Sequence, residues 1–114
     1  MKYRAVRLNK NTTKFYCGED IECSYYLIDE NDNIVTNLSA FVFTAKLYSD
    51  LNDGTEYDQA TYMTVSGAKV TLNIPNTLTT SFEYNERYIL ELSGTENNKI
   101  HTLIREEIYF GREI

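Results

Sequence analysis

The residue types that could carry out chemistry are few in this chain. His101 is the only histidine, and Cys17 and Cys23 are the only cysteines. Catalysis needs a positioned nucleophile, base or metal ion, and no nucleophile motif such as Gly-x-Ser-x-Gly accompanies His101. Two cysteines and one histidine do not make up the ligand set of a structural zinc site. We therefore expect His101 to be a surface residue in a hairpin arm, and we expect no enzyme activity and no catalytic or metal-binding residue.

The cysteines and carboxylates each allow a second interpretation. Cys17 and Cys23 could form a disulfide or a redox pair, but they lack the Cys-x-x-Cys spacing, and in a reducing compartment they behave as small hydrophobic residues. Paired carboxylates that meet in space could hydrolyse sugars. We expect the acidic candidates to be solvated instead: Glu83, Glu86, Glu106 and Glu107.

Two acidic segments resemble the start of a calcium-binding loop. They are Asp29-x-Asn31-x-Asn33 and Asp50-x-Asn52-x-Gly54. The first lacks the glycine and the distal glutamate that complete such a loop. Asp and Asn side chains also bond their own backbone in turns. We therefore expect both segments to form turns without an ion, and the sequence predicts no cofactor.

The length and the net charge of the chain limit the classes of partner that it can bind. The chain has 114 residues, enough for one domain over residues 1–114, with a net charge of −6 and a pI near 4.7. A chain this acidic lacks the basic surface that binds nucleic acid or anionic lipid. It contains no apolar run of about 18 residues and no segment resembling a signal peptide. We expect neither a nucleic-acid nor a membrane partner, and a cytoplasmic location.

The elements that would position any site are short strands. Apolar and polar residues alternate over Ile21–Ile28 and Ala40–Tyr48, as half-buried strands require. The turn at Gly94–Asn98 leads into a last strand whose phase is ambiguous, because alternation would bury Glu106 unless a bulge resets the register. The remaining predicted strands are Tyr3–Leu8, Lys14–Cys17, Tyr57–Val65, Lys69–Ile74, Arg87–Ser93 and Lys99–Tyr109.

About seven strands and no sustained helical period predict an all-β fold. Strands and turns at this spacing are typical of an antiparallel immunoglobulin-like β-sandwich. A small barrel is the alternative. One helical turn is predicted within residues 76–84, after Pro75 ends the preceding strand.

The order of turns and hydrophobic residues carries a resemblance to a known family. The matching segments are Cys17–Ile21, Asp29–Asn33, Thr36–Ala40, Val42–Lys46, Gly67–Pro75 and Tyr88–Leu92. This pattern resembles the immunoglobulin-like N-terminal domain of bacteriophage baseplate upper proteins and related small tail or neck proteins. The chain departs from it in lacking the hairpin glycine near Asn33 and Ile34. The resemblance implies a virion structural protein assembled in a bacterial cytoplasm, without catalytic residues.

Tyrosines are the strongest candidates for a binding surface. The chain has ten, and tyrosine is enriched at interfaces because it combines a large area with a polar tip. Tyr26 and Tyr48 are expected opposite the core faces of their strands, and Tyr57 and Tyr62 on opposite faces of the next strand. We expect these residues to contact other virion proteins or a second copy of the chain. The alternatives are a second layer of core, or a carbohydrate- or receptor-binding module whose tyrosines stack on sugar rings.

Overall fold

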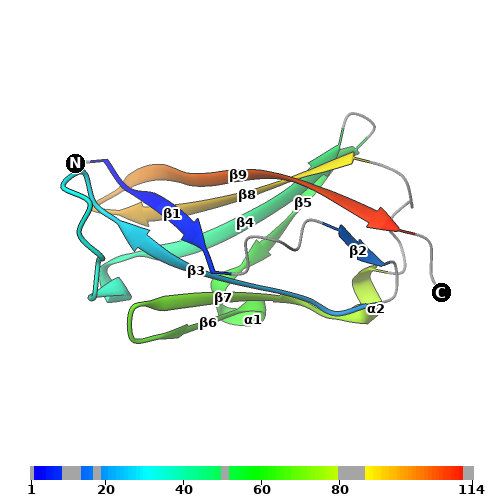
Figure 1. Ribbon diagram of the computed structural model, residues 1–114, viewed down its shortest axis with the longest axis horizontal. Coiled ribbons are helices and arrows are strands. Elements are labelled where there is room, and N and C mark those ends of the chain that lie inside the picture. The colour runs from blue at the N-terminus through cyan, green and yellow to red at the C-terminus, as the bar shows by residue number, and fades with distance from the viewer. Residues whose placement is uncertain (1, 9–13, 17–18, 50–51, 80–86, 112–114) are drawn as a thin grey trace.

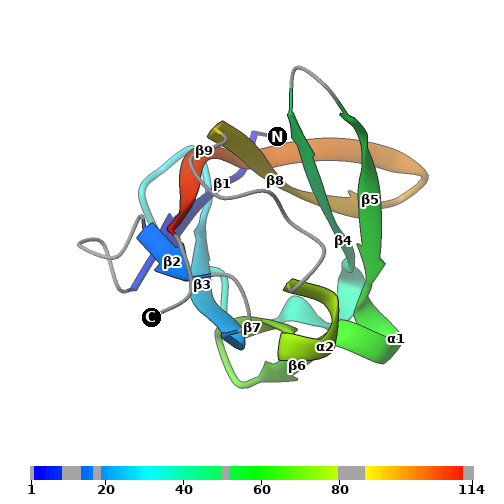
Figure 2. The same ribbon diagram turned by 90° about the vertical axis from the view of Figure 1, so that its right-hand side faces the viewer.

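The molecule is a sandwich of two β-sheets. The computed structural model describes residues 2–8, 14–16, 19–49, 52–79 and 87–111, and all statements of structure concern these residues. Within them, nine strands form a four-stranded and a five-stranded sheet (Figures 1 and 2). The domain measures 42 × 25 × 23 Å along its principal axes.

The four-stranded sheet has the order β1-β3-β7-β6 and is antiparallel throughout. Its strands are β1 (Arg4–Arg7), β3 (Ile21–Ile28), β7 (Lys69–Ile74) and β6 (Met63–Ser66). A two-residue turn at Gly67 and Ala68 joins β6 to β7, and Gly67 supplies the positive φ of 59° that this hairpin needs.

The five-stranded sheet has the order β2-β9-β8-β4-β5. Its strands are β2 (Lys14–Tyr16), β9 (Lys99–Gly111), β8 (Arg87–Glu96), β4 (Val42–Ser49) and β5 (Asn52–Asp58). Neighbours are antiparallel except for β2, which runs parallel to β9. Three short helices complete the described elements: η1 (Leu38–Ala40), α1 (Gln59–Tyr62) and α2 (Asn76–Thr79).

The core lies between the two sheets and consists of the inward-facing side chains of their strands. The predicted alternation of β3 is confirmed, since its buried residues are every second one. The same holds for β4 and the first part of β8. In β7, Thr71 is buried in addition to the alternating Val70, Leu72 and Ile74. The largest fully buried side chains are Tyr25, Tyr57, Phe43, Ile21, Leu27, Leu72, Ile74, Leu90, Leu92, Ile108 and Val70.

The predicted strand Tyr57–Val65 is wrong, because the chain changes sheets within it. β5 ends at Asp58, whose carboxylate accepts hydrogen bonds from the backbone N–H and the hydroxyl of Thr61, both at 3.0 Å. An aspartate in this position caps the first turn of a helix. The turn α1 then carries the chain from β5 in one sheet to β6 in the other.

The hairpin between β8 and β9 also differs from the prediction. Only Asn97 and Asn98 form its turn, with φ of 50° and 63°, as a tight hairpin turn requires. Gly94 lies inside β8, where a Cβ would come within 3.1 Å of the Phe41 ring and 3.2 Å of Leu103. A side chain at position 94 would therefore require Phe41 and Leu103 to shift by a few tenths of an ångström.

A bulge in β9 resolves the ambiguous phase of the last strand. Leu92 pairs with Ile104 and Ser93 pairs with Thr102, so Leu103 is an extra residue on β9. Leu103 is buried, whereas Ile100 is 75% exposed. The bulge thus lets the two halves of β9 keep different phases, and Glu106 still points inward.

Candidate binding surface

Tyr26 and Tyr48 lie on the outer faces of different sheets. Tyr26 is half-buried on β3, and its neighbours along the strand, Tyr25 and Leu27, are buried in the core. Tyr48 is half-buried on β4, where the Lys46 ammonium lies 5.6 Å from the centre of its ring. Both residues therefore point away from the core, as predicted, but they cannot contribute to one continuous surface.

Tyr57 and Tyr62 do not lie on opposite faces of one strand, which corrects the prediction. Tyr57 is 2% exposed in the core side of β5, and Tyr62 belongs to α1. Their rings pack edge to face, with centroids 5.1 Å apart. Burial raises the pKa of Tyr57 to about 12. A partner cannot reach Tyr57, which belongs to the core between the sheets, whereas Tyr62 is partly exposed.

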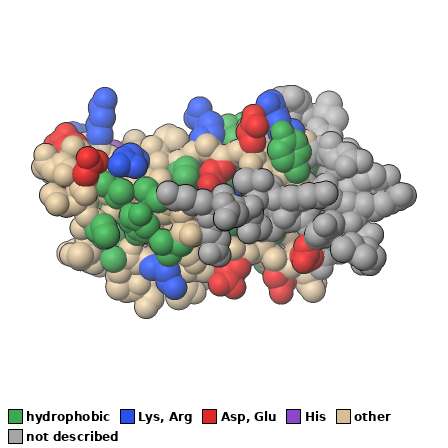
Figure 3. All heavy atoms as spheres, viewed as in Figure 1, with side chains coloured by type: hydrophobic (Ala, Val, Ile, Leu, Met, Phe, Trp, Pro, Cys, Tyr) green, Lys and Arg blue, Asp and Glu red, His purple; other side chains and the backbone are tan. Residues whose placement is uncertain are grey.

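The outer face of the four-stranded sheet carries an exposed apolar patch, here called the Tyr26 patch. Val6 pairs with Tyr26, and Ile28 forms a bridge with Ile34, so these side chains share one face. Ile34 is 54% exposed and Leu8, which extends β1, is 47% exposed. The members are Val6, Leu8, Tyr26, Ile28 and Ile34. Figure 3 shows hydrophobic side chains gathered over β1 and β3.

Charges surround the Tyr26 patch. Arg4 lies 3.2 Å from Asp32 in an exposed ion pair, and Lys69 is the register partner of Tyr26 on β7. An apolar centre with a polar border is the usual composition of a protein–protein interface.

The outer face of the five-stranded sheet carries charged residues as well as exposed apolar ones, among them Val42 and Ile100. Two ion pairs cross from β9 to β8, Arg105–Glu91 at 2.8 Å and Arg87–Glu107 at 3.0 Å. Glu107 is therefore surface-exposed, in agreement with the prediction. Glu83 and Glu86 lie outside the described residues.

Comparison with solved structures identifies the type of sandwich. The chain is similar to the filamin domain of Lin-41, with a TM-score of 0.59, 15% identity, and coverage of 96% of this chain and 93% of that one. The fold is immunoglobulin-like. No family model matches the chain, and no curated protein matches it. At this identity the likeness concerns the fold alone.

His101 does not sit on the surface of the immunoglobulin-like sandwich, which corrects the prediction. Its side chain is 17% exposed and packs edge-on against Tyr3, with centroids 5.2 Å apart. Its Nε2 atom lies 4.0 Å from Glu96 Oε1, beyond hydrogen-bonding distance. Tyr3 donates to the other oxygen of Glu96 at 3.3 Å. Within the described residues, the Nε2 atom of His101 is buried and has no hydrogen-bond partner.

Glu106 is not solvated, and this prediction is wrong. It points between the sheets, where its Oε2 atom accepts from Arg7 at 3.3 Å and from the Tyr25 hydroxyl at 3.1 Å. Arg7 is 4% exposed and Glu106 18%. Burial is the main cause that raises the pKa of Tyr25, and it also raises the pKa of the neighbouring Cys23 thiol. Sequence reasoning missed this cluster because Arg7 and Glu106 are 99 positions apart.

Cys23 is a buried free thiol, as expected for a small hydrophobic residue, and Cys17 lies outside the described residues.

The first calcium-like segment forms a turn that is closed by its own side chain. Asp29 Oδ1 accepts hydrogen bonds from the backbone N–H groups of Asn31 and Asn33 at 2.9 and 3.0 Å. The described residues contain no cluster of three or more potential metal ligands. The second calcium-like segment lies partly outside the described residues. No described helix is long and apolar enough to span a membrane.

Proposed function

We propose that this chain is a non-enzymatic structural or assembly protein of a bacteriophage virion. It would act by protein–protein binding in a tail, baseplate, neck or capsid, assembled in the bacterial cytoplasm. The order of turns and strands supports this proposal through its resemblance to virion domains. The observation that carries the binding role is the Tyr26 patch, an apolar surface around a tyrosine on the four-stranded sheet.

The Tyr26 patch suits a protein partner for two reasons. Its centre is a tyrosine held by a rigid central strand, so little side-chain freedom is lost on binding. Leu8 and Ile34 extend the apolar area on either side of it. The partner is another virion protein or a second copy of the chain.

Replacement of Tyr26 tests the proposal. The purified chain is analysed by light scattering and then by co-sedimentation with purified tail, neck, baseplate and capsid components. We expect Tyr26→Ala to weaken self-association or component binding by at least about tenfold, as truncation of an interface anchor does. Tyr48→Ala is the matched control on the opposite outer face and should bind normally.

A chain that stays monomeric and sediments with no virion component would contradict the proposal. The carbohydrate-binding alternative makes a different prediction, namely glycan-array binding that is lost on replacement of an exposed tyrosine.

A further inference from the structure

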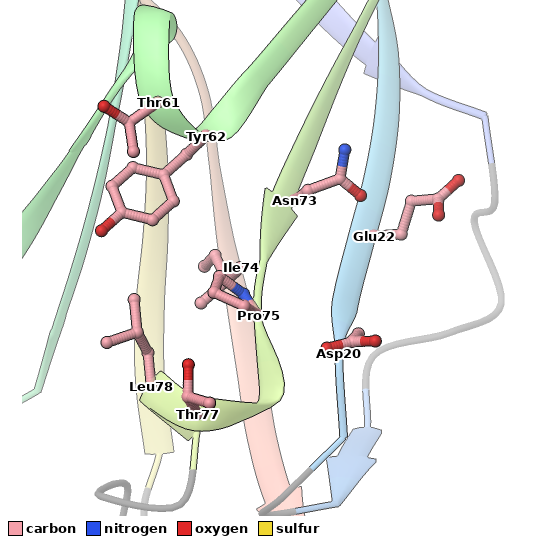
Figure 4. A pocket seen from close by; sticks show the side chains of 9 residues that line it. All are labelled: Asp20, Glu22, Thr61, Tyr62, Asn73, Ile74, Pro75, Thr77 and Leu78. Carbon is pink, nitrogen blue, oxygen red and sulfur yellow. The ribbon is translucent and has the colours of Figure 1, made fainter.

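The sandwich has a cleft of about 580 Å³ at one end of the four-stranded sheet, near the start of β3 and away from Ile28 and Ile34. It lies beside the end of β7, between α1 and α2 (Figure 4). Tyr62 from α1 and Leu78 from α2 point toward each other across it. Among the described residues, the lining includes Asp20, Glu22, Tyr62, Asn73, Ile74 and Leu78.

One wall of the cleft is an open strand edge. The ladder between β6 and β7 ends at the pair Met63–Leu72, because the chain before Met63 is coiled into α1. β7 continues for two more residues, Asn73 and Ile74, which pair with β3 on their other side. Among the described strands, none pairs with this last part of β7 on the side of the cleft.

The backbone groups of Asn73 face this open edge. In an antiparallel ladder, successive residues direct their N–H and C=O groups to alternate sides. Leu8 donates to the Ser24 carbonyl, so Ser24 faces β1, and its partner Thr71 therefore faces β6. Asn73, two residues after Thr71, has the same orientation. The edge thus offers one N–H and one C=O to an incoming strand.

The two faces of the cleft differ in chemistry. Asn73 and Glu22 are register partners with exposed side chains on the outer face of the sheet. On the inner side lie Ile74, Leu78 and the Tyr62 ring. Both charged residues in the described part of the lining are acidic. They are Glu22 and Asp20, and one oxygen of Asp20 accepts a hydrogen bond from the Asn76 N–H at 2.6 Å.

We propose that this cleft binds an extended peptide segment that carries a basic side chain, which adds as a short strand along Asn73 and Ile74. Main-chain hydrogen bonds provide affinity in strand addition, and alternate side chains provide specificity. The residue opposite Asn73 would direct its side chain to the outer face, within reach of Glu22, and a lysine or arginine suits this position. Its neighbour would direct an aliphatic side chain toward Tyr62 and Leu78. This site begins beyond the Leu8 end of the Tyr26 patch and shares no residue with it.

The probe is a blocked hexapeptide of alternating lysine and valine, titrated into the isotope-labelled full chain and followed by NMR. We expect the largest amide shifts at Asn73, Tyr62 and Leu78, and slower hydrogen exchange of the Asn73 N–H in the complex. Binding should weaken when salt is raised from about 0.1 M to about 1 M, because exposed charges are then screened. The matched hexapeptide of glutamate and valine should not bind.

Charge reversal locates the site. Glu22→Lys should weaken binding of the lysine peptide by about tenfold, which corresponds to about 1.4 kcal/mol. Glu30→Lys, an equal change of charge just beyond the other end of β3, is the control and should change binding less than twofold. Tyr26→Ala should leave peptide binding unchanged, so failure of this inference and failure of the assembly proposal are distinguishable.

Three results would overturn the inference: no shifts at the cleft, equal binding of the acidic hexapeptide, or full affinity in Glu22→Lys. Shifts without protection of the Asn73 N–H would overturn the strand-addition mode, because side-chain docking alone does not shield that group.

Discussion

The hydroxyl of Tyr25 donates a hydrogen bond of 3.1 Å to Glu106, on the same carboxylate oxygen that lies 3.3 Å from Arg7. Tyr25 and Arg7 belong to the four-stranded sheet, and Glu106 belongs to the five-stranded sheet. The contact therefore joins the two layers of the sandwich through a charge in the interior. A buried charge is costly unless it is paired and hydrogen-bonded.

Loss of one member of this ion pair should destabilise the fold strongly. Arg7→Met leaves the inward-facing Glu106 carboxylate without its cation, and we expect it to lower the free energy of unfolding by about 2–4 kcal/mol. The measurement is urea denaturation at neutral pH. The double variant Arg7→Met with Glu106→Leu is the control, because it removes both charges. We expect it to be more stable than Arg7→Met alone, and a lower stability would contradict this account.

Tyr25→Phe should have a smaller effect, because it removes a hydrogen bond and leaves the ion pair in place. We expect a loss of about 1–2 kcal/mol in the free energy of unfolding. Tyr26→Phe on the outer face is the matched control and should change stability by less than about 0.5 kcal/mol. Equal losses in the free energy of unfolding for Tyr25→Phe and Tyr26→Phe would show that the buried hydrogen bond of the Tyr25 hydroxyl adds no stability.

Stability should fall in alkaline solution. The pKa of Tyr57 is raised from 10.0 to about 12 in the folded state, so between these values the unfolded chain releases a proton that the folded chain keeps. Unfolding is then favoured as pH rises, by about 1.4 kcal/mol per pH unit for this residue. Below pH 10, Tyr57 is protonated in both the folded and the unfolded state, so this residue causes no loss of stability there. Urea denaturation of the wild type and Tyr57→Phe across this range checks the prediction, since the variant should show a shallower decline.

The cap of α1 offers a test of how the chain changes sheets. Asp58→Ala removes the acceptor of both hydrogen bonds from Thr61, and we expect it to cost about 1 kcal/mol of stability. Hydrogen exchange should speed up in α1 and leave β8 unaffected. Asp58→Asn keeps an acceptor and should retain most of the stability. If Asp58→Ala exchanged like the wild type, the cap would not hold the turn.

Gly94→Val tests the close packing at the centre of the hairpin. The added Cβ would meet Phe41 and Leu103 at 3.1 and 3.2 Å, so we expect a loss of about 1–3 kcal/mol in denaturation experiments. Ser93→Val introduces the same side chain on the outer face of the same strand. Its stability should stay within about 0.5 kcal/mol of the wild type.

The sequence predicted well which face of each strand is buried, but it did not predict where the chain passes from one sheet to the other. Alternation of apolar residues predicted the core-facing side chains of β3, and it predicted Val70, Leu72 and Ile74 of β7 but not the burial of Thr71. Asp58 looked like a polar strand residue, since nothing local distinguishes it from a cap until the path of the chain is known. Gly94 was assigned to a turn because glycine is most often found there, whereas its packing partner Phe41 is distant in sequence.

The site could be predicted only in part. Tyr26 was identified as outward-facing from its strand alone, but its patch needs Ile34, which a single bridge brings beside Ile28. The cleft depends on where β6 stops relative to β7, and register is a property of pairing that one strand's residues do not encode.

The bulge at Leu103 also restricts how this sequence can evolve. Because the side chains of a strand alternate, the gain or loss of one residue between Leu103 and Glu106 would turn Ile108 outward and withdraw Glu106 from Arg7. The length of this part of β9 is therefore fixed, although its exposed residues can vary. The tip at Asn97 and Asn98 is free of this constraint, so new loop sequence can be accepted there while the hydrophobic pattern of both strands is inherited unchanged.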